Sequence, residues 1–137
     1  MSEEARITSG WILITIPTIQ FGGVFLLSLF TRNMAGVTDN PKRHRLFVAG
    51  HAHAGVIVIL SLILQPLVDQ TTLAPALQWF IRSGAPFSAI LISAGMFLGM
   101  NADGTWNVLR NLIYLGALIL AAAVLLLGIG LLTASPT

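Results

Sequence analysis

Four long apolar runs, separated by short polar segments, take up most of the 137 residues. A helix that crosses the hydrocarbon core of a bilayer needs about 20 mostly apolar residues, and each run is close to that length. The chain is 55% hydrophobic and only 9% charged, far more apolar than an ordinary soluble domain. The predicted spans are residues 11–30, 46–68, 83–100 and 112–132. The sequence therefore predicts one all-α domain, an integral membrane antiparallel four-helix bundle.

Residues 73–82 form a shorter segment ahead of the third run. The segment is entered through Pro75 and carries Trp79, a residue type enriched at membrane–water interfaces. It is compatible with a short interfacial helix, and equally with the first turns of a longer, tilted third helix.

Basic residues distinguish the two sides of the membrane. One side holds Arg32, Lys42, Arg43, Arg45 and Arg110, and the other holds Arg6 and Arg82. Cytoplasmic loops carry an excess of Lys and Arg, so we expect the loop 31–45 to be cytoplasmic and both termini to lie outside. The chain would then be a multi-pass protein of the cell (inner) membrane. We read the basic residues as topology determinants and expect no nucleic-acid partner.

Local signals predict how the spans are joined and how closely they pack. Asn40 followed by Pro41 is typical of a helix start, so the second helix should begin before the membrane does. Residues 101–105 are rich in turn formers, which predicts a hairpin between the third and fourth spans. Small residues offer close helix contacts at Gly50 and Ala54, Gly95 and Gly99, and Ala117 and Ala121.

Several classes of chemistry are excluded by what the chain lacks. It has no cysteine, so disulfides, thiolate metal ligands and thiol nucleophiles are ruled out. No phosphate-binding loop or catalytic triad is visible in the sequence. We therefore do not expect the chain to be catalytic on its own.

The three histidines and three of the four methionines are expected near one face of the membrane, because antiparallel spans start and end there in turn. The residues placed there are Met34, His44, His51, His53, Met96 and Met100. Imidazole and thioether ligands together favour copper, especially Cu(I). The sequence therefore predicts a metal site with His51 and His53 as principal ligands and Met96, Met100 and His44 as further candidates.

Helical spacing limits which of these side chains can share one ion. Residues two apart point about 200° apart, so His51 and His53 converge only where the helix unwinds, which the flanking Gly50 and Gly55 would permit. His44 and His51, seven residues apart, share a face more naturally, and His53 would then face another helix or a second site. The competing interpretation makes the histidines hydrogen-bonded structural groups and the methionines core filler.

The run Arg45-Leu-Phe-Val-Ala-Gly-His51-Ala-His53-Ala-Gly resembles the second transmembrane helix of haem-copper oxidase catalytic subunits, where a histidine binds the low-spin haem. The chain is too short for the multi-helix core of that family and lacks its later histidine cluster, so it is not a member. The resemblance implies that a histidine here can carry haem, with a second histidine or a methionine opposite it. Haem is thus the second possible cofactor after copper.

Two functions follow from these features. The first is a small membrane metalloprotein or accessory subunit of a redox or metal-handling membrane complex, with lipid and other membrane subunits or a second copy as partners. The second is a non-catalytic structural subunit that packs against a larger membrane enzyme and holds no cofactor. A third, weaker interpretation is a pH-responsive element, because histidine titrates near neutrality.

Overall fold

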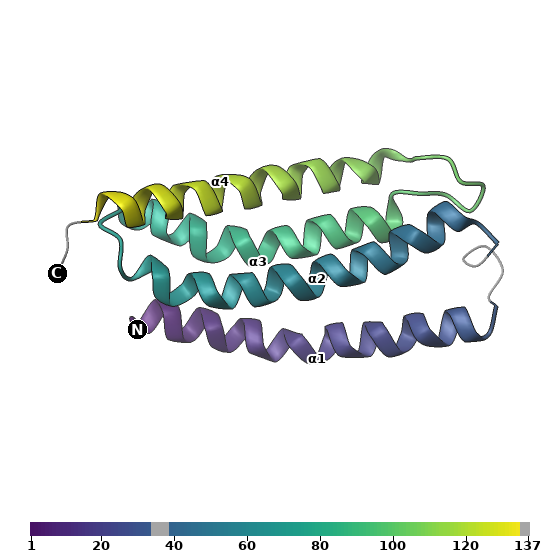
Figure 1. Ribbon diagram of the computed structural model, residues 1–137, viewed down its shortest axis with the longest axis horizontal. Coiled ribbons are helices and arrows are strands. Elements are labelled where there is room, and N and C mark those ends of the chain that lie inside the picture. The colour runs from purple at the N-terminus through teal and green to yellow at the C-terminus, as the bar shows by residue number, and fades with distance from the viewer. Residues whose placement is uncertain (34–38, 135–137) are drawn as a thin grey trace.

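A computed structural model describes residues 1–33 and 39–134. It contains four long helices, α1 (Glu3–Thr31), α2 (Pro41–Val68), α3 (Pro75–Leu98) and α4 (Asn111–Thr133), with the short 3-10 helix η1 (Val108–Arg110) ahead of α4 (Figure 1). Each long helix is long and apolar enough to cross a bilayer. The predicted all-α, multi-pass membrane bundle is confirmed, and Met34 lies outside the described residues.

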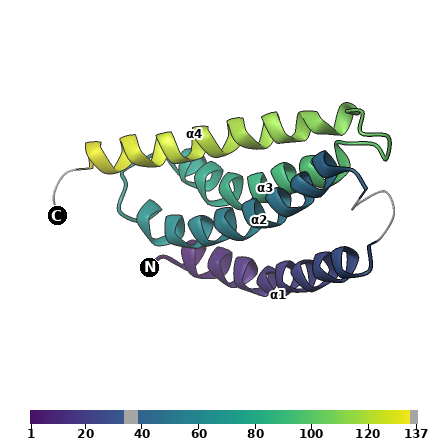
Figure 2. The same cartoon turned by 45° about the vertical axis from the view of Figure 1, so that its right-hand side comes forward.

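The helices run antiparallel and follow one another in chain order from α1 at one edge to α4 at the other (Figures 1 and 2). Helix α3 packs along α2 and along α4, whereas α1 lies mainly against α2, and no described Cα atom of α1 lies within 8 Å of one of α4. We call the end that carries both termini the Asp69 end and the opposite one the Asp103 end. Of the four helices, α1 is the least enclosed.

The start of α2 is as predicted. The side chain of Asn40 accepts hydrogen bonds from the amides of Lys42 and Arg43, at 3.1 and 3.3 Å, and Pro41 occupies the first turn. This cap satisfies two of the amide groups that have no partner within a helix. Helix α2 therefore begins five residues ahead of the apolar run that starts at Leu46.

The predicted hairpin between α3 and α4 is also present. Asp103 accepts a hydrogen bond from the amide of Thr105 at 2.9 Å, and Gly104 adopts φ +85°, a conformation that favours glycine. The turn is closed by a bond from the amide of Asn101 to the carbonyl of Thr105. Polar turn chemistry thus sets the antiparallel pairing of the last two helices.

Helix α3 continues without a break from Pro75 to Leu98. A separate interfacial helix over residues 73–82 is therefore not formed, and the alternative, a longer third helix, is confirmed. The physical reason is that Pro75 fits the first helical turn, where its missing amide costs nothing. Trp79, half-exposed, lies on the second turn of α3 near the Asp69 end.

Small residues bring α4 close to α3, as expected at Gly95. A Cβ atom built on Gly95 would lie 2.6 Å from Cγ1 of Ile113 and 2.8 Å from the backbone nitrogen of Ile113. A Cβ atom built on Gly116 would lie 2.7 Å from Cγ1 of Ile92. Close backbone approach of this kind drives helix association in lipid, where hydrophobic attraction between helices is absent.

The expectation for Ala117 and Ala121 is wrong, since both are exposed. The face of α4 that meets the rest of the bundle carries the buried residues Gly116 and Ala123 instead. Helix α4 is apolar all round, so its sequence does not reveal which face is covered.

We predict that Gly95→Ala lowers the free energy of unfolding by about 1–3 kcal/mol, because the added methyl group collides with the backbone of α4. The matched control is Gly128→Ala, where nothing lies within 4 Å of the added atom. That variant should unfold like the parent or slightly later, since alanine favours helix more than glycine. Unfolding in mixed micelles, followed by circular dichroism, measures both; equal losses would contradict the close packing.

Candidate functional site

His51 lies in the seam between α1 and α2. A Cβ atom built on Gly23 would lie 2.9 Å from Nε2 of His51, and one built on Gly22 would lie 3.9 Å from Nδ1. The ring therefore rests against two glycines of α1 and is half-buried. Within residues 1–33 and 39–134 its nitrogens have no hydrogen-bond partner.

His53 points away from the bundle. Its Nδ1 donates a 2.7 Å hydrogen bond to the carbonyl of Ala49 on its own helix, and the side chain is exposed. Because a carbonyl only accepts, this bond fixes the proton of a neutral ring on Nδ1. The free electron pair is then on Nε2, the nitrogen available to an outside group.

The remaining predicted ligands have separate surroundings. The ring of His44 meets that of Phe30 edge to face, with centroids 4.2 Å apart. Met96 packs against the apolar cluster of α1, α2 and α3. Met100 is 4% exposed and pairs with Trp106 in an isolated antiparallel bridge.

Helix α2 is continuous through both histidines, so the local unwinding that would let His51 and His53 share an ion is not present. His44 and His51 do share a face, since both meet α1. In the part of the chain that the structure describes, no three His, Asp or Glu side chains come close enough to hold a metal ion. A copper site in this part of the chain would therefore need methionine ligands or ligands from a partner.

A polar cluster at the Asp69 end was not predicted from the sequence, which gave Arg82 only as a topology determinant on the outer side. Arg82 is only 3% exposed and lies inside α3. Its Nη2 donates to Oδ1 of Asp69 at 2.5 Å, and its Nη1 donates to the carbonyl of Gln65 at 2.8 Å. We call Ser2, Gln65, Asp69 and Arg82 the polar network.

Gln65 and Arg82 exchange hydrogen bonds across the α2–α3 interface. Pro86 has no amide hydrogen, so the carbonyl of Arg82, four residues earlier, has no partner within α3. Nε2 of Gln65 donates to that carbonyl at 3.2 Å. In return, Arg82 donates to the carbonyl of Gln65, one of the last four of α2 and thus without an intrahelical partner.

Ser2 extends the network to α1. Its amide donates to Oδ2 of Asp69 at 2.6 Å, its hydroxyl accepts from the amide of Ala5 as the cap of α1, and Nη2 of Arg82 reaches that hydroxyl at 3.4 Å. Partial burial raises the pKa of Asp69, but hydrogen bonds from Ser2 and Arg82 and the charge of Arg82 outweigh it, and the pKa falls to about 2. Asp69 therefore stays ionised and neutralises the buried guanidinium.

A spacing signal in the sequence could have revealed part of this network. Asp69 follows the last turn of the second span, and Arg82 lies just ahead of the third. Oppositely charged residues at the same membrane face are natural partners. What the sequence does not show is that Pro86 leaves the carbonyl of Arg82 free for Gln65.

We predict that Gln65→Leu lowers the free energy of unfolding by about 1–3 kcal/mol, because the buried carbonyl of Arg82 loses its partner. The loss should be smaller in a Pro86→Ala background, where the amide of residue 86 can bond that carbonyl. A double-mutant cycle in mixed micelles measures the coupling. The control Gln70→Leu, at an exposed position, should have no effect, and additive losses in the cycle would contradict the exchange.

We predict that the bundle loses stability as the pH falls from about 4 to about 2. The pKa of Asp69 is 3.8 in the unfolded chain and about 2 in the folded one. Its contribution to the free energy of unfolding is therefore complete above pH 3.8 and is lost as the pH falls to about 2. Asp69→Asn should be less stable at neutral pH and should lack this part of the acid dependence. Acid titration of the unfolding midpoint measures it, and parallel curves for parent and variant would exclude Asp69 as the cause.

No family model, no curated protein and no solved structure matches this chain.

Proposed function

We propose that this chain is an accessory subunit of a larger redox or metal-handling membrane complex, and that it contacts the complex through the outer face of α2. The carrying observation is the exposed imidazole of His53. His53 lies seven residues beyond Leu46, where the apolar run begins, which is about 10 Å at 1.5 Å per residue. A polar ring at that depth is unfavourable against lipid and is normally covered by protein or a cofactor.

The surroundings of His53 suit a protein partner. Five exposed apolar residues of α2 form a stripe at helical spacing: Val48, Ala52, Val56, Ile59 and Ile63. Ala52 precedes His53 directly, and Gly55, with nothing within 4 Å of an added Cβ, follows it. Small residues permit the close approach of another helix.

The tautomer of His53 supports a ligand role. Histidines that bind metals usually donate their other ring nitrogen to a carbonyl or carboxylate, which orients the ring and leaves one nitrogen for the metal. The bond from Nδ1 to Ala49 has this form. His53 would supply one ligand to a haem or copper ion, and a partner subunit or a second copy would supply the rest.

A structural subunit without a cofactor is the second candidate. Two features favour it: His51 and His53 face different sides of α2, and the polar network already ties three helices together. In this case Nε2 of His53 would accept a hydrogen bond from the partner.

We predict that the complex, purified in mild detergent from its native membrane, contains a stoichiometric haem or copper that is lost in both His53→Ala and His53→Gln. Absorption spectra and elemental analysis measure the cofactor, and mass spectrometry identifies bound subunits. The matched control is His51→Ala, whose ring faces α1, and it should keep the cofactor.

Other outcomes separate the two candidates. A colourless, metal-free complex that dissociates with His53→Ala but persists with His53→Gln would favour the structural subunit, because glutamine can still accept a hydrogen bond. Loss of the cofactor in His51→Ala but not in His53→Ala would contradict the assignment to His53.

A further inference from the structure

An apolar groove lies between α1 and α3, with α2 as its floor. Its volume is about 460 Å³, within the range of small-molecule pockets. Thr8 and Thr15 line it from α1, Ser83 and Ile90 from α3, and Ala54 from α2. The groove exists because α1 packs mainly against α2 and makes few contacts with α3.

The hydroxyl groups along the groove do not make it polar. Oγ1 of Thr15 donates to the carbonyl of Ile12 at 2.7 Å, and Oγ1 of Thr18 donates to the carbonyl of Thr15 at 2.6 Å. Oγ of Ser93 donates to the carbonyl of Gly50 at 2.9 Å. Because these protons are engaged by backbone carbonyls, this stretch suits a hydrocarbon chain better than a polar ligand.

A polar pocket of about 410 Å³ lies at the Asp69 end and is lined by Glu4, Asp69, Gln78, Trp79 and Arg82, among others. It continues the groove along the same two helices: Glu4 is one turn from Thr8 on α1, and Trp79 is one turn from Ser83 on α3. The two hollows therefore lie end to end, polar at the membrane face and apolar toward the interior.

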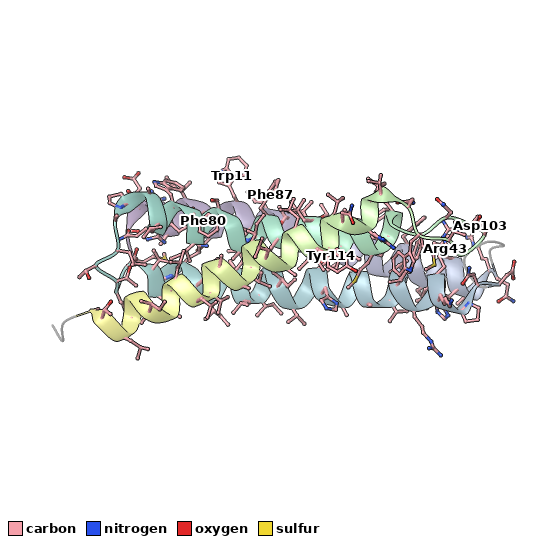
Figure 3. The ribbon with its side chains drawn as sticks, turned by 90° about the horizontal axis from the view of Figure 1, so that it is seen from above. Trp11, Arg43, Phe80, Phe87, Asp103 and Tyr114 are labelled. Carbon is pink, nitrogen blue, oxygen red and sulfur yellow. The ribbon has the colours of Figure 1, made fainter. Side chains whose placement is uncertain are left out.

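The dimensions suit one leaflet of a bilayer. From Thr8 to Ile19, which both line the groove, α1 rises about 16 Å at 1.5 Å per residue. Half of a hydrocarbon core about 30 Å thick is about 15 Å. Trp11 and Phe87, 67% and 56% exposed, stand on the same side of the molecule at the rim of the groove (Figure 3).

The charges at the polar mouth favour a zwitterionic headgroup. Arg82 is neutralised by Asp69, and the amino group of Met1 also lies 4.0 Å from Asp69. The exposed carboxylate of Glu4 and the face of Trp79 remain for a positive group. Counting Glu4 and Asp69 against Arg82 and the amino group of Met1, the mouth has no net positive charge to favour an anionic headgroup.

We infer that α1, α2 and α3 hold one zwitterionic phospholipid, with an acyl chain in the groove and its ammonium group at the mouth beside Glu4 and Trp79. This inference goes beyond the proposed function and does not depend on it. The lipid would fill the space that α1 leaves open toward α3 and would stabilise the position of α1.

The test is native mass spectrometry of the full chain, delipidated in detergent and titrated with dioleoyl phosphatidylethanolamine. We expect a saturable adduct of one lipid per chain. Ala54→Leu and Thr15→Phe each place a larger side chain in the groove, so each should lower the affinity for the lipid at least about tenfold. The matched controls Ala52→Leu and Ile14→Phe make similar changes at exposed neighbours outside the groove and should bind like the parent. Circular dichroism checks that every variant is folded.

The headgroup is tested with the same protein and dioleoyl phosphatidylglycerol, which should bind more weakly than the ethanolamine lipid. Glu4→Gln should reduce this preference. The inference is overturned if no saturable adduct forms, or if the groove variants and their controls lose lipid affinity equally. It is also overturned if the spectra show a dimer of the chain in place of the lipid adduct. Equal binding of the two lipids would overturn the assignment of the headgroup.

Discussion

The reciprocal hydrogen bonds between Gln65 and Arg82 are the interaction on which the Asp69 end of the bundle depends. Each side chain satisfies a backbone carbonyl of the other helix, one freed by Pro86 and one at the end of α2. A buried guanidinium is costly unless it is paired and hydrogen-bonded, and Asp69 supplies the opposite charge. The amide of Ser2 bonds the same carboxylate, so the start of α1 is held at this point as well.

The two ends of the molecule are held by different kinds of hydrogen bond. At the Asp69 end, buried polar groups from three helices bond one another. At the Asp103 end, local turn and cap bonds join neighbouring segments, and the histidine rings lie against α1 or outward. His51 and His53 accordingly face different sides of α2, the first toward α1 and the second outward. The groove between α1 and α3 results from the way α1 is held. Helix α1 is bonded to the polar network at its start and packs against α2, with few contacts to α3.

The candidate site was only partly predictable from the sequence. His44, His51 and His53 could be placed on one helix, and the shared face of His44 and His51 follows from their spacing. Their spacing alone does not predict that this face meets α1, where Gly22 and Gly23 leave room for an imidazole. The buried hydrogen bonding of Arg82 was not predicted either, since a basic residue ahead of an apolar run is typical of the membrane interface. Its burial results from a proline one turn later and a glutamine on another helix.

The sequence by itself determined the four spans, their antiparallel order, the cap at Asn40 and the turn at Asp103, because apolar length and local hydrogen bonding need only neighbouring residues. Tertiary structure alone decided which face of each helix is covered. Helix α4 shows the reason: it is apolar on every side, so the close contact at Gly116 rather than Ala117 depends on the shape of α3. In a bilayer, apolar surface can face lipid or protein at similar cost, and only the fit between helices and their few polar bonds selects the arrangement.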